Sequence, residues 1–278
     1  MNVYLVETSA FMRKAQIKTL CGLSLEPNLG EEYKSTFSKS INIIWLADIN
    51  ELPRREAVHF FLANEFFDAL PFQKFQKNAD GIYREILIDL DKHLNKLEFV
   101  MSKRPTLGSQ IILNLNPNYR KFEHVEVSSE SARYMEVIAK RMQEYNGSTL
   151  IIDYGHDGMC KDTFRAFKNH KLVEDVFQDL GECDLTYDVD FAFLKYISQL
   201  SNSICYGPVT QHNFLKEMQI DLRLNALLKV CKTEADKSKL IHDYGFLMKP
   251  ENMGEKFKVM AIRKLDFKQP PPGFFKNL

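Results

Sequence analysis

Short apolar runs that end at acidic residues are the feature that most constrains the fold of this chain. Residues 58–63 form one such run, and the sequence NEFFDALP (residues 64–71) follows it with two carboxylates three residues apart, Glu65 and Asp68. A run of this length and composition is typical of a buried strand. Because open α/β sheets hold their ligands at the carboxyl ends of their strands, we expect Glu65 and Asp68 to face a pocket.

A second run, residues 3–6, ends at Glu7. Ser9 is a predicted N-cap for the helical pattern that follows, and Gly22 is expected to close that helix. A carboxylate in this position can accept hydrogen bonds from both ribose hydroxyls of a nucleotide. An acid beside a helix N-terminus is also explained by its favourable interaction with the helix dipole, so both interpretations stay open.

A third run, residues 148–152, leads into Asp153, Tyr154 and His156, which offer a charge, an aromatic face and a titratable ring. Gly155 and Gly158 would let the backbone pass close to a ligand. His156, Asp153 and Cys160 match no standard zinc spacing. The sequence therefore predicts a binding segment here and no metal site.

The remaining patterns alternate between helix and strand. Strands are predicted over residues 41–46 and 256–262, and a hairpin over 72–77 and 83–90 around Asp80 and Gly81. Helices are predicted over 214–218, 221–231 and 236–244. Another helix is expected after a cap at Ser128 or Ser129, with one apolar stripe formed by Ala132, Met135, Ile138, Ala139 and Met142. Residues 161–190 are predicted to be polar and irregular. Within them DLTYDVD (184–190) is interpreted as a solvated loop that caps the helix after Asp188, and a functional role for it stays open. The pattern as a whole indicates an α/β protein with antiparallel hairpin additions.

Composition narrows the class of protein. The 278 residues are 45% hydrophobic and 27% charged with a formal net charge of zero, which suits one large α/β domain and gives no electrostatic argument for nucleic acid. The five cysteines are scattered, so neither a disulfide framework nor a zinc knuckle is indicated. No apolar segment approaches the ~20 residues of a membrane span, and no targeting segment is visible.

Several of these segments together resemble one family. They are NEFFDALPFQKFQK, IIDYGHDG, DLTYDVDF, the GPVTQ segment at residues 207–211 and the MGEKFK segment at residues 253–258. In this order they resemble the successive signatures of the MidA-like protein arginine methyltransferases, which include the mitochondrial complex I assembly-factor methyltransferases. The resemblance runs from about residue 4 to residue 262.

The resemblance implies a class I S-adenosylmethionine-dependent methyltransferase fold, which is Rossmann-like, and S-adenosyl-L-methionine as methyl donor. It also implies a mitochondrial protein that makes symmetric dimethylarginine on a complex I subunit, with no nucleic acid and no membrane insertion. The oligomeric state stays open. The residue roles that follow are catalytic for Glu65 and Asp68, cofactor-binding for Glu7, Asn64 and Phe66, and substrate-binding for Asp153, Tyr154 and His156.

The predicted roles suit the chemistry of arginine methylation. A guanidinium is charged at neutral pH and a poor nucleophile, so it must be oriented by carboxylates and must lose a proton as the new bond forms. One of Glu65 and Asp68 would clamp it while the other accepts the proton, in an order that stays open. Phe66, Phe67 and Tyr154 could supply aromatic faces near positive charge, although Phe66 and Phe67 are equally explained as core residues.

The chain departs from the family pattern at its beginning. It starts at the strand that is second in the family's fold, and no GxGxG-like segment occurs in it. We therefore expect a methyltransferase domain over residues 1–265 that lacks its first strand and glycine-rich loop, and a tail over 266–278. Loss of a central strand would leave unpaired backbone groups, each costing about 1–3 kcal/mol. The alternative function is a catalytically inactive truncated form that acts only as a protein-binding or assembly factor. A nicotinamide-dependent oxidoreductase is not favoured, because its glycine fingerprint is also absent.

Overall fold

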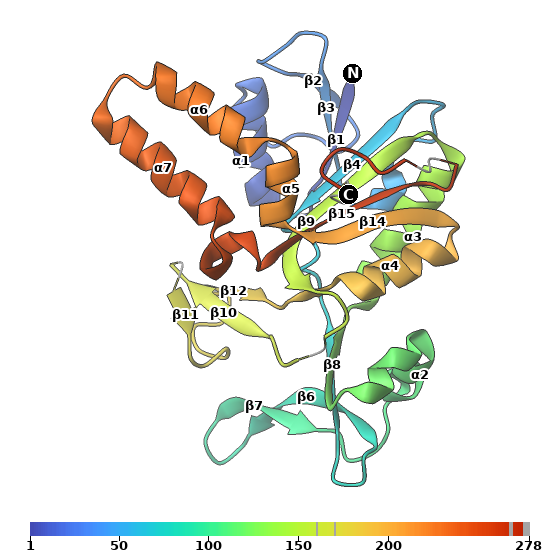
Figure 1. Cartoon of the computed structure of the whole chain (residues 1–278). Helices are drawn as coiled ribbons and strands as arrows, with labels where there is room; N and C mark the ends of the chain where they lie inside the picture. Colours follow the sequence, from blue (N-terminus) through green and yellow to red (C-terminus); the bar gives the residue numbers. More distant parts are fainter. Residues whose placement is uncertain (160, 170, 267–268, 275–278) are drawn as a thin grey trace. The chain divides into compact units, whose positions relative to one another are not determined.

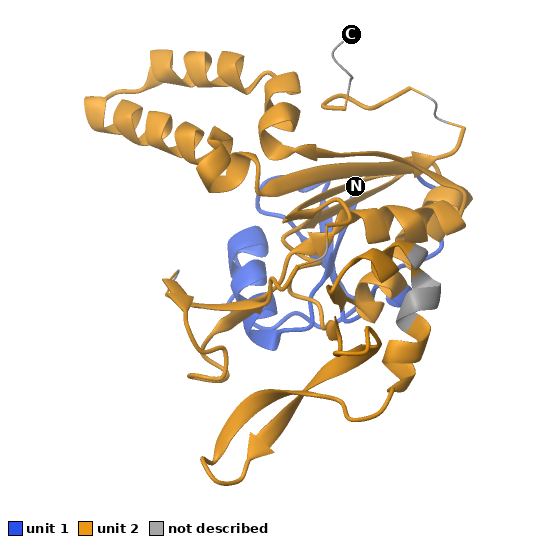
Figure 2. Ribbon diagram, turned by 60° about the horizontal axis from the view of Figure 1, so that its bottom comes forward, with its two compact units in different colours: residues 1–57 blue, residues 58–278 orange. Residues whose placement is uncertain are grey.

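The computed structural model describes residues 1–159, 161–169, 171–266 and 269–274 (Figure 1). The chain divides into two compact units, residues 1–57 and residues 58–278 (Figure 2). The prediction of one methyltransferase domain over residues 1–265 stays a prediction.

The first unit contains β1 (Asn2–Val6), α1 (Ala10–Cys21), β2 (Glu32–Lys34), β3 (Asn42–Leu46) and the 3₁₀ turn η1 (Ile49–Glu51). β1 pairs with β3 in parallel, and β2 pairs with β3 antiparallel. The Ser9 side chain caps α1 and Gly22 ends it at a φ of 71°, which confirms the helix limits predicted from sequence. The core of this unit packs Ile17 of α1 against Ile43 and Trp45 of β3.

The second unit is built on a mixed sheet of β13 (Val189–Asp190), β9 (Gly147–His156), β15 (Phe257–Lys264) and β14 (Ser203–Thr210), in that order. β4 (His59–Asn64) also pairs with β9, and both β4 and β13 run parallel to it. β15 is antiparallel to β9 and to β14. Among the described residues β4 pairs with β9 alone, as β1 does with β3.

Two glycines of β9 allow its neighbours to approach. A Cβ added at Gly147 would lie 1.7 Å from the backbone oxygen of His59, and one added at Gly155 would lie 2.1 Å from that of Val189. β4 pairs with residues 147–152 of β9 and β13 with residues 155–156. The close neighbour of Gly155 is therefore the backbone of β13 and not the ligand expected from the sequence.

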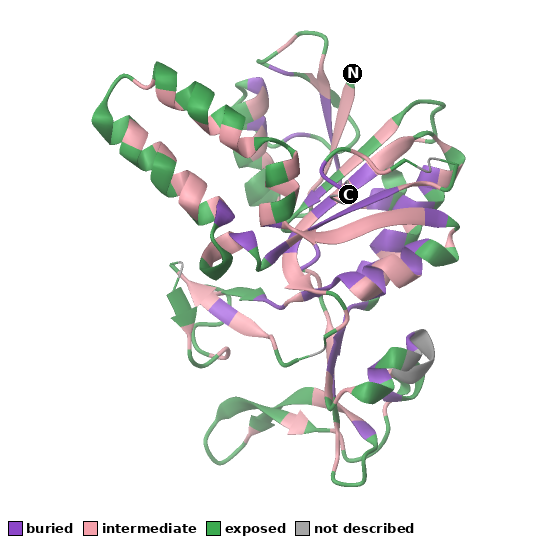
Figure 3. Cartoon of the chain, in the orientation of Figure 1, coloured by how far each residue is buried: buried purple, intermediate pink, exposed green. Residues whose placement is uncertain are grey.

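Two helices lie near this sheet, α3 (Ser129–Glu144) and α4 (Phe191–Leu200). Ser128 caps α3, and the predicted apolar stripe is buried at Met135, Ile138, Ala139 and Met142. Figure 3 shows this buried stripe together with the buried centre of the sheet. The packing of α3 is therefore the one that its sequence period predicted.

A second sheet follows the order β7 (Lys96–Met101), β6 (Tyr83–Asp91), β5 (Gln73–Lys77) and β8 (His124–Val127), with all pairs antiparallel. The chain between β7 and β8 forms α2 (Leu107–Leu115) and the turn η2 (Pro117–Lys121). The predicted hairpin around Asp80 and Gly81 is confirmed as β5 and β6. In Figure 1 the β6–β7 hairpin extends away from the mixed sheet.

Residues 161–190 differ from the irregular segment expected from sequence. β10 (Arg165–Lys168), β11 (Lys171–Val173) and β12 (Asp184–Thr186) form a small antiparallel sheet in the order β11-β10-β12. Thr186, Tyr187 and Asp190 are buried, so the interpretation of residues 184–190 as a solvated loop is wrong. α4 begins after Asp190, whose side chain accepts a hydrogen bond from the Phe193 amide, whereas Asp188 pairs with Arg165.

The last helices confirm the predicted helical segments. They are α5 (Gln211–Glu217), α6 (Ile220–Val230), α7 (Glu234–Met248) and the short η3 (Pro250–Gly254). α6 and α7 form a hairpin whose surface is largely exposed (Figure 3). No helix in the described part of the chain combines the length and the apolar character needed to cross a membrane.

Candidate functional site

Three segments of the second unit converge on the carboxyl group of Asp68. Its Oδ2 accepts hydrogen bonds from the Tyr154 hydroxyl of β9 and, at 2.9 Å, from the Thr186 hydroxyl of β12. Its Oδ1 is buried and has no hydrogen-bond partner among the described residues. Asp68 is only 8% exposed, so one oxygen of this buried carboxyl group is held in place while the other is left unsatisfied.

The turn that carries Asp68 is organised by Asp153. Oδ2 of Asp153 accepts the backbone N–H groups of Phe66, Phe67 and Asp68 at 3.2, 3.1 and 3.3 Å. Oδ1 accepts the N–H of Tyr154 at 3.0 Å, and the residue is completely buried. The structure thus gives Asp153 a positioning role for the turn. Its predicted contact with substrate stays a prediction.

Burial raises the pKa values of both Asp153 and Tyr154. Burial, with the charge of Asp68 as the next cause, raises the pKa of Asp153 to about 8, although its backbone hydrogen bonds act in the opposite direction. Burial and the hydrogen bond to Asp68 also raise the pKa of the Tyr154 phenol. Tyr154 therefore keeps its proton at neutral pH and can donate it to Asp68 in a hydrogen bond.

Glu65 lies in an unusual backbone conformation at the end of β4. Its φ is 46°, in the left-handed region that a residue with a side chain adopts at a cost of about 1–2 kcal/mol. Its side chain is exposed, as is that of Asn64, whose amide nitrogen lies 3.5 Å from Glu65 Oε1. The left-handed residue turns the chain from the strand into the segment whose N–H groups meet Asp153.

The aromatic residues of the motif have different surroundings. Phe67 is completely buried, which confirms that at least one of Phe66 and Phe67 is a core residue. Phe66 is half-buried and packs edge-on against Phe67 and Tyr134, with ring centroids 5.1 and 4.9 Å apart. The ring of Tyr154 has the Arg165 guanidinium 5.0 Å from its centroid, and Arg165 is paired with Asp188 at 2.7 Å. One face of Tyr154 therefore already borders a cation.

His156 lies further along β9 and is directed toward Asp190. Its Nδ1 is 3.9 Å from Asp190 Oδ1, and Asp190 also accepts the hydroxyl of Tyr119 at 3.3 Å. Burial lowers the pKa of the imidazole and raises that of the Asp190 carboxyl. Substrate binding by His156 stays a prediction. Cys160, which the sequence analysis weighed as its metal-binding neighbour, lies outside the described residues.

Glu7 belongs to the first unit and stands at the end of β1. Its Oε1 accepts the N–H of Ser9 at 2.9 Å, and its Oε2 accepts the Gln16 side chain at 3.3 Å. Gln16 in turn accepts the indole N–H of Trp45 at 2.8 Å. The hydrogen bond from Ser9 matches the interpretation of Glu7 as an acid that interacts with a helix N-terminus. Each oxygen of Glu7 accepts one of these hydrogen bonds, so both keep lone pairs for further donors.

Thr186 and Tyr187 belong to this site but were not predicted as site residues. Tyr187 donates a hydrogen bond to the Phe67 carbonyl at 3.1 Å, and its ring stacks on Phe72 at 4.2 Å. Two sequence signals marked this segment, the acids in residues 184–190 and the resemblance of DLTYDVDF to a family signature, but neither singled out these two residues. The neutral residues between them contact the NEFFDALP turn.

A separate cavity of about 310 Å³ lies after the end of β9. Its walls are formed by Asn116, Asn118, Tyr119, Lys121, Phe122, Asp157, Gly158 and Ala192. Neither Asp68 nor Glu65 lines it. Tyr119, whose hydroxyl binds Asp190, lines the cavity, whereas the predicted substrate residue His156 does not.

Comparison with solved structures defines the class of protein. A structure from Burkholderia thailandensis bound to S-adenosyl-homocysteine matches with a TM-score of 0.68 and 19% identity, over 84% of this chain and 59% of the other. A second, native structure from the same organism gives the same score, over 61% of its length. The chain therefore has the fold of S-adenosylmethionine-dependent methyltransferases.

Sequence comparison identifies the family. The family model described as "Putative S-adenosyl-L-methionine-dependent methyltransferase" matches residues 1–209, and the chain belongs to this family. Relatives named "Protein arginine methyltransferase NDUFAF7, mitochondrial" are 40% identical over 94% of the chain in Danio rerio, 40% over all of it in Xenopus tropicalis and 38% over 94% in Homo sapiens. The chain covers 61%, 64% and 58% of these relatives, so it spans about three fifths of their length.

Proposed function

We propose that this chain supplies the arginine-binding side of an S-adenosylmethionine-dependent protein arginine N-methyltransferase. The observation that carries the proposal is the buried, unpartnered Oδ1 of Asp68. Leaving such an acceptor unsatisfied costs about 1–3 kcal/mol, and a bound donor would remove that cost. A guanidinium offers planar N–H donors and a permanent positive charge, which suits a carboxylate better than any other common side chain.

The surroundings of Asp68 favour this role over a purely structural one. Tyr154 and Thr186 both bind Oδ2, so the carboxyl group is oriented while the buried Oδ1 is left without a hydrogen-bond donor. Because the Tyr154 phenol keeps its proton, it acts as a donor to Asp68 and does not compete with the guanidinium. Orientation of this kind is the main contribution that a protein can make to an in-line displacement.

Glu65 is proposed as the proton acceptor. It belongs to the same turn as Asp68 but is exposed, so a proton taken from the guanidinium can pass on to water. Asp68 and Glu65 would thus divide the two tasks, with the buried acid holding the arginine and the exposed acid accepting the proton.

S-adenosyl-L-methionine, when bound, supplies the methyl group as part of a sulfonium cation. Glu7 is proposed to bind its ribose hydroxyls, since both carboxylate oxygens keep lone pairs beside the N-terminus of α1. The exposed amide of Asn64 and the half-buried ring of Phe66 are the other proposed contacts. Asp153 and Tyr154 act on the substrate side by holding the turn and Asp68, and His156 is proposed to contact the protein substrate.

The names of the relatives support a mitochondrial protein with a protein substrate. The family resemblance adds the finer proposal, which is symmetric dimethylation of an arginine on a complex I subunit. Mass spectrometry of the methylated product distinguishes symmetric from asymmetric dimethylarginine, and complex I subunits offered as substrates test the target.

A second candidate function is protein binding without catalysis, as an assembly factor. It is favoured by the outer residues of β4, since Phe60 and Leu62 are 78% and 71% exposed in a strand of the mixed sheet. Apolar groups exposed side by side are typical of surfaces that a partner covers.

Calorimetric titration of S-adenosylmethionine, followed by transfer of a labelled methyl group to an arginine peptide, separates the two candidates. Donor binding with methyl transfer is the result expected for the enzyme. A chain that binds no donor but still binds a complex I subunit would support the second candidate and contradict the first.

A further inference from the structure

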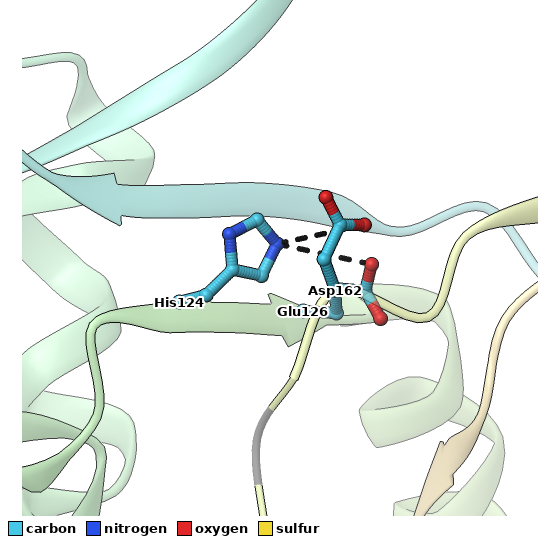
Figure 4. A group of neighbouring side chains, drawn as sticks. All are labelled: His124, Glu126 and Asp162. Atoms are coloured by element: carbon cyan, nitrogen blue, oxygen red, sulfur yellow. Dashed lines mark ion pairs between the residues drawn. The ribbon is translucent and has the colours of Figure 1, made fainter.

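Three side chains that the methyltransferase proposal does not use meet at one end of the second sheet. His124 and Glu126 lie on β8, and Asp162 comes from the segment that precedes β10 (Figure 4). Nε2 of His124 is 3.9 Å from Glu126 Oε1 and 4.0 Å from Asp162 Oδ1. One ring nitrogen is thus directed at two carboxylate oxygens.

The state of that nitrogen points to a ligand. His124 Nε2 is buried and has no hydrogen-bond partner among the described residues. Distances of 3.9 and 4.0 Å are too long for hydrogen bonds, and carboxylates offer acceptors only. A buried ring nitrogen that faces two carboxylates without a bond is the arrangement that a cation between them would satisfy.

We propose that His124, Glu126 and Asp162 form a binding site for a divalent transition-metal ion, with Zn²⁺ as the ion to test. Tetrahedral coordination with bonds of about 2.1 Å holds ligand atoms about 3.4 Å apart, so an ion bound between Nε2 and either carboxylate would draw each oxygen about 0.5 Å closer to the ring. All three ligand atoms lie within 4.8 Å of one another, and the Asp162 side chain is 59% exposed and can rotate inward. An imidazole with two carboxylates suits Zn²⁺ or Mn²⁺ better than Ca²⁺.

Glu126 is already held in position for this role. Its Oε1 accepts the N–H groups of Thr163 and Phe164, both at 3.2 Å, and its Oε2 accepts the Thr163 hydroxyl. Thr163 and Phe164 directly follow Asp162. Their hydrogen bonds to Glu126 therefore hold the segment that carries Asp162 against β8. Thr163 Oγ1 also accepts the N–H of Asp188 at 2.9 Å. A bound ion would therefore fix residues 162–164 against β8 and act as a structural metal.

Lys74 is the competing cation. Its Nζ lies 2.8 Å from Asp162 Oδ1, and also 4.8 Å from the ring centroid of Phe99. Binding of a metal ion would require Asp162 to exchange this ion pair for a metal bond. Removal of the Lys74 charge should therefore strengthen metal binding. If the three residues form only a network of ion pairs, no metal will bind after the same change.

The test is calorimetric titration of Zn²⁺ into the full chain and three variants. The parent is expected to bind one Zn²⁺ at this site, with affinity at least about tenfold weaker in His124→Gln. Lys74→Met is expected to bind severalfold tighter. Lys77→Met is the matched control, because Lys77 lies on the same strand in an ion pair with Glu123 at 3.0 Å, and its removal should leave the affinity unchanged.

Circular dichroism shows whether each variant is folded, and an Asp162→Asn variant, changed at an exposed position, supplies a second ligand substitution if His124→Gln does not fold. Absence of Zn²⁺ binding in both the parent and Lys74→Met would overturn the proposal. Equal affinity in the parent and in the folded ligand variants would overturn it as well.

Discussion

The Tyr154 hydroxyl donates a hydrogen bond to the Asp68 carboxylate across 86 positions of sequence. The bond joins the central strand of the mixed sheet to the turn after β4, and Thr186 adds a second donor to the same oxygen. Both donors lie on one side of the carboxyl group. Their common effect is to orient Oδ1, the atom that we assign to the substrate arginine.

Replacing Tyr154 by Phe should therefore weaken arginine binding without affecting the methyl donor. We expect the KM for an arginine peptide to rise about tenfold, corresponding to loss of one hydrogen bond to a charged group, with unchanged affinity for S-adenosylmethionine. Steady-state kinetics over a range of peptide concentrations measures the effect. A double-mutant cycle with Thr186→Val tests whether the two donors act together, and an unchanged KM in both single variants would contradict the positioning role.

Gly155 should resist substitution because β13 lies against its Cα. Gly155→Ala places a methyl group 2.1 Å from the Val189 carbonyl oxygen, and overpacking of this kind costs about 1–3 kcal/mol. Gly245→Ala is the control. It lies inside α7 with its nearest neighbour at 3.6 Å, so this change should stabilise the chain by about 0.5–1 kcal/mol. Thermal unfolding of both variants checks the opposite signs.

The ionisation of Asp153 should make stability depend on pH. Its pKa is about 8 in the folded chain and about 3.9 in an unfolded one, so between these values the folded state holds a proton that the unfolded state has lost. The contribution of Asp153 to the free energy of unfolding therefore falls as pH rises through this window and is constant above it. Asp153→Asn removes the contribution.

Urea unfolding at about pH 5 and about pH 8 measures this effect. The parent should lose stability relative to Asp153→Asn at the higher pH. A difference that is the same at both values would contradict the raised pKa.

The left-handed conformation of Glu65 predicts an unusual response to glycine. Glu65→Gly removes the strain of a side chain at a φ of 46° and should stabilise the chain by up to about 1 kcal/mol, whereas Asn64→Gly in the adjoining strand should destabilise it by about 0.5–1 kcal/mol. Chemical denaturation gives both values. A loss of stability in Glu65→Gly as large as that in Asn64→Gly would show that the conformation is not strained.

Local patterns predicted the local structure well. The cap at Ser9, the end of α1 at Gly22, the stripe of α3 and the hairpin at Asp80 and Gly81 each depend on residues close together in sequence. These features follow from periodicity and turn chemistry alone, which is why the sequence was sufficient to predict them.

The site could be predicted only in part because its bonds are long-range. Glu65 and Asp68 were found from their place after an apolar run, but the partner of Asp68 on β12 is 118 positions away and Asp153 is 85 positions away. The strands in residues 161–190 pair in a short sheet, and their sequences show no strong alternation of apolar and polar residues. The segment was therefore expected to be irregular. In residues 184–190 it is Thr186 and Tyr187, and not the aspartates, that contact the NEFFDALP turn. These contacts also exist only once the chain has folded.

Asp68 is proposed to hold the arginine that receives the methyl group, and labelled methyl transfer to an arginine peptide by Asp68→Asn tests this role. Asp80→Asn, in the exposed turn of the β5–β6 hairpin, is the matched control. We predict that Asp68→Asn lowers the rate at least about 100-fold, as expected for loss of a charged contact to the reacting group, while donor affinity is kept and Asp80→Asn is unaffected. Full methyl transfer by Asp68→Asn would contradict the account.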